Sequence, residues 1–232
     1  MIRDFLRRQT NYRICGSIAW KTRNKRMRLF NEFFKDFVLC DKGGYVDETI
    51  RILDVGGVPE YWEYMDFIYL GKSKITSINV KNYDIPKRLN YIVNSVIGTA
   101  IDMRDFDDKE FDLAFSNSVI EHVGGFDCQK KMANEMLRVA RHGFLQTPNR
   151  YFFMEPHFLF PFFQFLPQFV RTEIVYRFDT GHYKKAESRS EAKQLVGSIN
   201  LLSGRQLRFL FPRAEISKEK WFGMTKSYIV KW

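Results

Sequence analysis

The side chains best suited to move protons in this chain are His122, Glu155 and His157. An unperturbed histidine titrates close to neutral pH, so His122 can serve as a general base. Glu155 and His157 form a carboxylate–imidazole pair inside a phenylalanine-rich segment, where they can share acid and base roles. We therefore predict that these three residues are catalytic. A second interpretation of His122, as a structural histidine bonded to a loop carbonyl, stays open.

A pair of glycines follows the first strong strand signal. Arg51–Val55 reads as a short buried strand, and it runs directly into Gly56 and Gly57. Paired glycines let the backbone turn sharply and approach a ligand without a Cβ in the way. In open α/β sheets, ligands bind at the carboxyl ends of the strands. This pattern predicts a nucleoside-type ligand over the two glycines.

A second strand signal lies about 60 residues later. Residues 112–116 read as another buried strand, and small polar residues lead from its end into Glu121 and His122. Together, RILDVGG and FDLAFSNSVIEHV resemble the class I S-adenosylmethionine-dependent methyltransferases, in particular the type 11 methyltransferase family. The resemblance covers about residues 49–150 and extends more loosely to the C-terminus. The absence of a third glycine after Gly57 argues against a dinucleotide-binding fold.

The resemblance implies the fold, the cofactor and its contacts. We expect an α/β, Rossmann-like class I fold: a mostly parallel seven-stranded sheet with helices on both faces. The implied cofactor is S-adenosyl-L-methionine. The residues predicted to contact it are Asp54, Gly56, Gly57, Asn79, Thr99, Ala100, Asp102, Met103, Ser116, Asn117 and Ser118.

Two of these positions depart from the family pattern. Asn79 stands where the family has an acid for the ribose hydroxyls, and an amide lacks the charge-assisted bond of a carboxylate. Thr99 stands where an acid takes the adenine amino group, and Asp102 is the predicted substitute, with Met103 packed on the adenine face. Asp54 either orders the glycine loop or reaches the cofactor amine through water. Asp102 has the alternative role of capping a turn.

The segment after the fifth strand is the candidate acceptor site and lid. About residues 148–185 form an aromatic insertion with three predicted substrate-binding residues, Asn149, Arg150 and His182. A packed lid, an apolar acceptor pocket and a membrane-dipping surface are three interpretations of its phenylalanine run. A transmembrane helix needs about 20 apolar residues, and the polar residues and prolines here argue against one.

The net charge of +10 is concentrated at the N-terminus. Residues 1–28 hold nine basic residues against Asp4 alone, which leaves +2 for the remainder. Residues 1–45 read as a basic helical extension, and residues 46–232 as the methyltransferase domain. The arm either packs on the domain through its apolar residues or meets anionic lipid or nucleic acid.

Cysteine and histidine spacing predicts neither disulfides nor a metal. The three cysteines are scattered, which is typical of reduced thiols. The four histidines show no paired ligand spacing, so no metal site is expected. The N-terminus lacks the apolar run of a signal peptide. We expect a cytoplasmic location, with peripheral contact at a membrane surface as an option.

These observations predict an S-adenosylmethionine-dependent methyltransferase acting on a small or medium acceptor. Oxygen is the expected methyl acceptor, on a sugar, a lipid-linked compound or another hydroxylated metabolite, because no amine-reading motif is visible. One alternative is a degenerate fold that serves as a non-catalytic interaction or membrane-surface module. A further alternative, a nucleic-acid methyltransferase, is disfavoured by the nearly neutral domain. The oligomeric state is left open.

Overall fold

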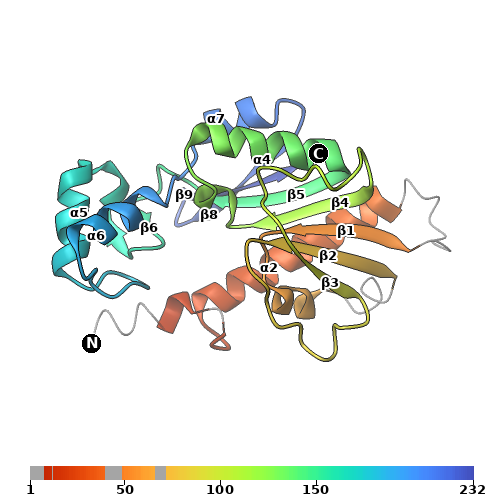
Figure 1. Cartoon of the computed structure of the whole chain (residues 1–232), viewed down its shortest axis with the longest axis horizontal. Helices are drawn as coiled ribbons and strands as arrows, with labels where there is room; N and C mark the ends of the chain where they lie inside the picture. The colour runs from red at the N-terminus through yellow and green to blue at the C-terminus, as the bar shows by residue number, and fades with distance from the viewer. Residues whose placement is uncertain (1–7, 12, 40–48, 66–71) are drawn as a thin grey trace.

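A seven-stranded sheet forms the centre of the computed structural model, which describes residues 8–11, 13–39, 49–65 and 72–232 (Figure 1). The strand order is β3-β2-β1-β4-β5-β9-β8. The strands from β1 to β5 are parallel to one another, whereas β9 is antiparallel to both β5 and β8. The strands are β1 (Ile50–Val55), β2 (Ser73–Asn79), β3 (Val93–Ile97), β4 (Phe111–Asn117), β5 (Ala140–Pro148), β8 (Glu215–Trp221) and β9 (Met224–Lys231). The predicted fold class is confirmed.

The central strands are buried on both faces, which explains their nearly continuous apolar runs. Ile52 and Phe115 point to one face of the sheet, and Leu53 and Ala114 to the other. Two helices, α4 (Phe126–Val139) and α7 (Gly204–Leu210), cover the second face (Figure 1). A capping box that starts at Ser203 sets the start of α7.

The N-terminal helix α2 (Ile18–Phe33) covers the opposite face of the sheet (Figure 1). Ser17 caps it by accepting a hydrogen bond from the Trp20 amide. Phe30 is fully buried, and its ring meets those of Phe115 and Phe144 at 5.0 and 5.5 Å between centroids. The basic extension is therefore part of the core of the domain. The predicted boundary at residue 45 lies outside the described residues.

Helices are scarcer between the early strands than we expected. A π-helix, η1 (Phe34–Leu39), continues α2, and a 3-10 helix, η2 (Pro59–Tyr64), follows β1. The segments from β2 to β3 and from β3 to β4 are fully described and contain no helix. Aromatic side chains of α2 and η2 cover that face of the sheet instead.

The aromatic insertion forms a lobe beside the sheet, with a small apolar cluster of its own (Figure 1). Its elements are β6 (Met154–Glu155), β7 (Phe160–Pro161), η4 (Phe163–Phe165), α5 (Gln168–Arg177) and α6 (Arg189–Gly197). Its cluster includes Ala192 and Leu201, so the lobe extends beyond the predicted end at about residue 185. Throughout the described residues, every helix is too short or too polar to cross a bilayer.

Candidate functional site

The backbone after β1 turns through a glycine in the left-handed region. Gly56 has a φ of +73°, and its amide donates to the Ile78 carbonyl at 2.9 Å. A Cβ at this position would lie 2.5 Å from Val119 Cγ1. Glycine is therefore required at residue 56 both by the backbone conformation and by the space.

Asp54 points away from the ligand side of this loop. Its carboxylate is fully buried, and Oδ2 accepts a hydrogen bond from Trp62 Nε1 at 2.8 Å. A Cβ on Gly57 would collide with the same carboxylate. Burial raises the pKa of Asp54 to about 7, although the Trp62 bond opposes the rise. Of its two predicted roles, this position favours ordering of the glycine loop.

Asn79 lies at the end of β2 and faces the same loop. Its Nδ2 donates to the Gly57 carbonyl at 2.9 Å and to Ser77 Oγ at 3.1 Å. The amide therefore uses its donors to hold the protein's own loop. Only its Oδ1 is left to accept from a ribose hydroxyl.

The predicted adenine contacts separate into exposed and buried residues. Thr99 Oγ1 accepts from the Ile101 amide at 3.4 Å within a turn that includes the half-buried Ala100. Asp102 is exposed and pairs with Arg104. Met103 is 1% exposed and packs in the core beneath α4, so it presents no surface to a ligand. The prediction that Met103 packs on the adenine is corrected on this ground.

The small polar residues at the carboxyl end of β4 also differ in their surroundings. Ser116 is fully buried, and its Oγ donates to the Val55 carbonyl, so it joins β4 to β1 and does not contact a ligand. This corrects its predicted role. Asn117 and Ser118 both line the main cavity, and Ser118 has a φ of +56° with its Oγ bonded to Gln146 Oε1 at 2.8 Å.

That cavity, of about 600 Å³, lies at the carboxyl ends of β1, β4 and β5. Its volume is within the range of small-molecule sites. Of the predicted residues, those in its lining are Gly56, Gly57, Asn117, Ser118, Asn149, His157 and His182. Asn79, Thr99, Ala100 and Asp102 are not in the lining.

Sequence reasoning missed the cationic wall of this cavity. Arg23 and Arg26 of α2 line it together with Lys226 of β9 and Tyr61 of η2. The Arg23 guanidinium lies 4.5 Å from the centre of the Tyr61 ring. Burial raises the pKa of Tyr61 to about 12, so its hydroxyl stays protonated. The excess of basic residues at the N-terminus was the feature of the sequence that could have indicated this wall. The direction in which their side chains point, however, depends on how α2 packs.

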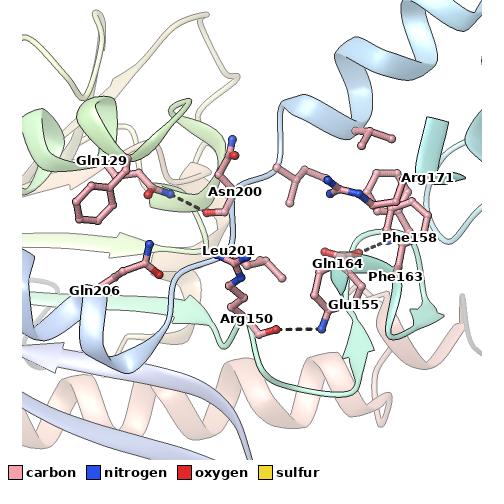
Figure 2. A pocket seen from close by; sticks show the side chains of 13 residues that line it. Gln129, Arg150, Glu155, Phe158, Phe163, Gln164, Arg171, Asn200, Leu201 and Gln206 are labelled. Atoms are coloured by element: carbon pink, nitrogen blue, oxygen red, sulfur yellow. Dashed lines mark hydrogen bonds between the residues drawn. The ribbon is translucent and has the colours of Figure 1, made fainter. Parts of the chain in front are cut away.

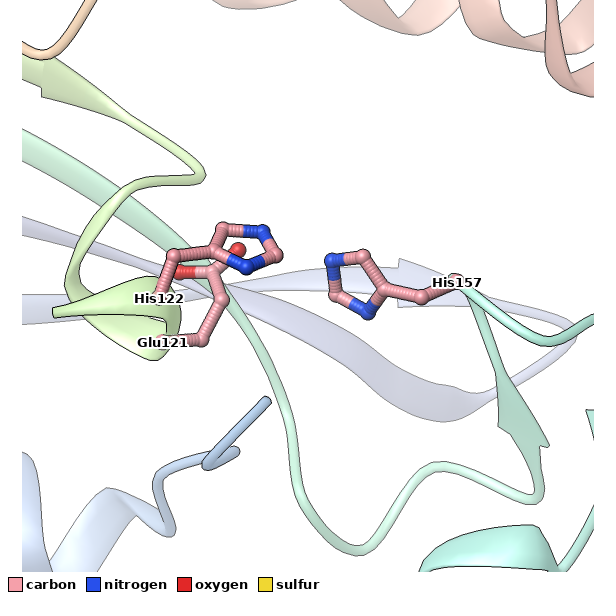
Figure 3. Close-up of side chains that lie close together, drawn as sticks. All are labelled: Glu121, His122 and His157. Carbon is pink, nitrogen blue, oxygen red and sulfur yellow. The ribbon is translucent and has the colours of Figure 1, made fainter. Parts of the chain in front are cut away.

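The predicted proton-transfer residues lie close together, and His157 among them lines the cavity. Figure 3 shows His122 and His157 side by side. The rings of His122 and His157 pack edge to face with 4.8 Å between centroids. Glu155 Oε1 lies 2.7 Å from His157 Nδ1, and its Oε2 accepts from the His157 and Phe158 amides. The His182 amide donates to the His157 carbonyl, which places His182 at the same mouth.

The two histidines have opposite pKa shifts. Desolvation and the neighbouring His157 lower the pKa of His122 to about 4, so its imidazole is neutral at pH 7. Burial alone would lower the pKa of His157, but the bond to Glu155 and the charges of Glu155 and Glu121 raise it overall. His157 is therefore the stronger base of the two.

Arg150 belongs to a second, smaller hollow of about 270 Å³ between the sheet and the lobe (Figure 2). Arg171 and the buried Glu155 also line it. Asn149, by contrast, uses its side chain within the fold: Nδ2 donates to the Thr225 carbonyl and Oδ1 accepts from the Tyr151 amide. The structure thus places the three predicted substrate-binding residues in two different hollows.

The cavity fits the cofactor that the sequence implies. Backbone at Gly56 and Gly57 is open to it at the carboxyl end of β1, and polar groups of Asn117 and Ser118 stand beside apolar surface from Phe115. A mostly apolar lining with few polar groups is typical of nucleotide-sized ligands. The methionine end of the cofactor would lie here, beside the cationic wall.

Known proteins share this fold, and one family model matches part of the chain. The type 11 methyltransferase domain matches residues 60–145. No curated protein sequence matches the chain. A putative O-methyltransferase from Nostoc punctiforme is 8% identical with a TM-score of 0.51, over 97% of this chain and 60% of that one. A methyltransferase from Methanosarcina mazei is 14% identical with a TM-score of 0.46, over 82% and 94%.

The first of these structures supports the fold, and the domain match runs from η2 through β2, β3 and β4 into β5. The strand order, the antiparallel β9 and the glycine turn after β1 agree with that family. The domain match implies S-adenosylmethionine as the cofactor. Residues 60–145 match the type 11 methyltransferase domain, and they lie within a chain that has the class I methyltransferase fold.

Proposed function

We propose that the enzyme methylates a hydroxyl group of a small or medium acceptor bound in the 600 Å³ cavity. This proposal rests on one observation. The Gly56–Gly57 loop and His157 line the same cavity, and the Glu155 carboxylate is bonded to the His157 ring. A hydroxyl must lose its proton on methylation, and His157 can take it.

The protein residues divide this work between them. Glu155 holds His157 through Nδ1, which leaves Nε2 to accept a proton from the acceptor. Glu155 is itself fixed by two backbone amides, so the pair is preorganised. The bound cofactor supplies an electrophilic methyl group on a sulfonium. Most of the rate would come from holding the hydroxyl in line with that methyl group.

The cavity wall also suggests the kind of acceptor. Aromatic surface from Tyr61, Phe152 and Trp221 faces the cationic groups of Arg23 and Lys226. Aromatic faces bind the flat or apolar body of a ligand, and cations favour an acidic substituent. An aromatic or prenyl-type acceptor with a hydroxyl and an acidic group fits both surfaces.

The test begins with the cofactor. Calorimetric titration with S-adenosylmethionine and S-adenosylhomocysteine should show micromolar binding that Gly56→Arg abolishes. Isotope transfer to phenols, hydroxylated sugars and hydroxylated lipids should then depend on His157. His157→Gln should lower kcat by about 10²–10⁴ while leaving the cofactor Kd unchanged. Transfer only to amines or carbon would overturn the choice of oxygen.

Exposed aromatics on the lobe favour a lipid-linked acceptor as a second candidate. Phe162, Phe169 and Phe178 are 57%, 72% and 62% exposed. Exposed apolar side chains in a cluster are typical of membrane or protein contact. Phe169→Ser should reduce co-sedimentation with anionic vesicles. Phe209→Ser should not, because Phe209 is also exposed, at 62%, but lies on α7. Equal sedimentation of all three proteins would remove this candidate.

Two arginines of the basic arm that line the cavity are engaged within the protein and are not free to bind nucleic acid. Arg26 pairs with Glu219 inside the protein, and Arg23 packs on Tyr61. Binding to the phosphate backbone would require cations that face solvent. This packing favours a small acceptor over a nucleic acid.

A further inference from the structure

A group of metal-ligating side chains lies at the edge of the main cavity. Glu121 and His122 belong to η3 (Ile120–His122), directly after β4, and His157 follows β6. One ligand atom from each of the three lies within 4.8 Å of the others. Figure 3 shows the two imidazoles facing each other with the Glu121 carboxylate beside them.

The Glu121 carboxylate is placed as a ligand would be. It is fully buried, and its Oε2 accepts from Thr147 Oγ1 at 2.9 Å. Its Oε1 makes no hydrogen bond within the described structure. A buried carboxylate is costly unless it is paired or coordinates a metal. Thr147 orients the group and leaves Oε1 for a cation.

His157 has the partner that metal-bound histidines commonly have. Such histidines donate their second ring nitrogen to a carboxylate, which fixes the ring and increases its basicity. Glu155 provides this bond at 2.7 Å from Nδ1, and two backbone amides hold Glu155 in place. Nε2 is then the nitrogen available to a metal.

We propose that Glu121, His122 and His157 bind one divalent first-row transition-metal ion of the zinc class. Two imidazoles and one carboxylate are the ligands that such ions prefer, whereas Mg²⁺ and Ca²⁺ favour oxygen alone. Three protein ligands are typical of catalytic zinc sites, in which a fourth position stays open. Here His157 also lines the cavity, so an acceptor oxygen can reach that position.

The role of the ion in catalysis rests on the proposed O-methylation. The existence of the metal site does not depend on that proposal. With the ion bound, His157 Nε2 would hold the metal instead of acting as the base. A hydroxyl on the ion would then ionise more readily and release its proton to water, which would help an acceptor that ionises poorly at neutral pH. Metal binding can be measured without cofactor or acceptor. A failure of metal binding and a failure of O-methylation are therefore distinguishable.

Full-length protein freed of metal with a chelator should be titrated with Zn²⁺ by calorimetry and with Co²⁺ by visible absorption. We expect one ion per chain and Co²⁺ bands typical of low-coordinate nitrogen and oxygen ligation. Glu121→Gln and His157→Gln should each weaken Zn²⁺ binding more than about 100-fold. Glu155→Gln, which removes only the supporting charge, should weaken it about 10- to 100-fold.

His142→Gln is the matched control, because His142 lies on β5 outside this cluster. It should leave the stoichiometry and the affinity unchanged. Circular dichroism of each variant shows whether weaker binding comes from a lost ligand or from a lost fold. The Co²⁺ spectrum of the wild type tests the site without any substitution. Absence of stoichiometric Zn²⁺ and Co²⁺ binding by the wild type would overturn the proposal. Equal affinity in the wild type and His157→Gln would do the same.

Discussion

Arg26 on α2 and Glu219 on β8 form a buried ion pair, with 2.8 Å between Nη2 and Oε2. The carboxylate also accepts a hydrogen bond from Ser227 Oγ. Desolvation would raise the pKa of Glu219, but Arg26 outweighs it and lowers that pKa overall. The pair joins an N-terminal helix to a C-terminal strand across the cavity, so the basic extension is a structural part of the site.

Removing one partner of this pair should destabilise the protein strongly. Arg26→Met leaves the Glu219 carboxylate buried without its cation, and such a change typically costs about 3–5 kcal/mol. Chemical denaturation measures the free energy of unfolding. Arg104→Met is the matched control, because its pair with Asp102 is exposed and screened by solvent, so its loss should change the stability little. Similar losses in both variants would contradict the prediction.

Asp54 should make the stability of the protein fall as pH rises. Its pKa is about 7 in the folded protein against 3.8 for an ordinary aspartate, so folding favours the protonated form. Its contribution to stability is full below pH 3.8 and is lost as pH rises towards 7. The shift corresponds to roughly 4 kcal/mol at most. Asp54→Asn should flatten this slope in denaturation curves at pH 5, 6 and 8. An unchanged slope would mean that Asp54 is charged in the fold.

Replacing Gly56 with alanine should impair the cofactor loop more than the fold. The left-handed conformation costs a residue with a Cβ about 1–2 kcal/mol, and Val119 must also move. We expect the Kd for S-adenosylhomocysteine to rise at least about tenfold. Gly197→Ala, at the end of α6 with nothing near its added Cβ, is the control and should bind normally. Equal binding by both variants would argue against a cofactor over the glycine turn.

Restoring the family's acid at residue 79 should not improve the site. Asn79→Asp would replace two donated hydrogen bonds by a carboxylate facing the Gly57 carbonyl and Ser77. Leaving such buried groups unsatisfied costs about 1–3 kcal/mol each. Thermal unfolding should show a lower Tm, and calorimetry a weaker cofactor affinity. Tighter cofactor binding by Asn79→Asp would show that the carboxylate reaches the ribose. Asn79→Ala is the control, because it removes the amide donors without adding a negative charge.

The sequence by itself determined the sheet and the glycine turn after β1. Apolar runs at β1 and β4 predict strands buried on both faces, and Gly56 marks the turn because only glycine adopts its conformation without strain. These signals are local, since each depends on neighbouring residues along the chain.

Only the tertiary structure decided which side chains face the ligand. Ser116 and Met103 follow strand ends as cofactor contacts should, yet packing turns both into the interior. His157 joins Glu121 and His122 because the lobe brings it next to η3, and the spacing of these residues along the chain does not indicate that contact. Arg26 reaches Glu219 across 193 residues for the same reason. Side-chain direction depends on contacts between distant segments, which the three-dimensional packing alone establishes.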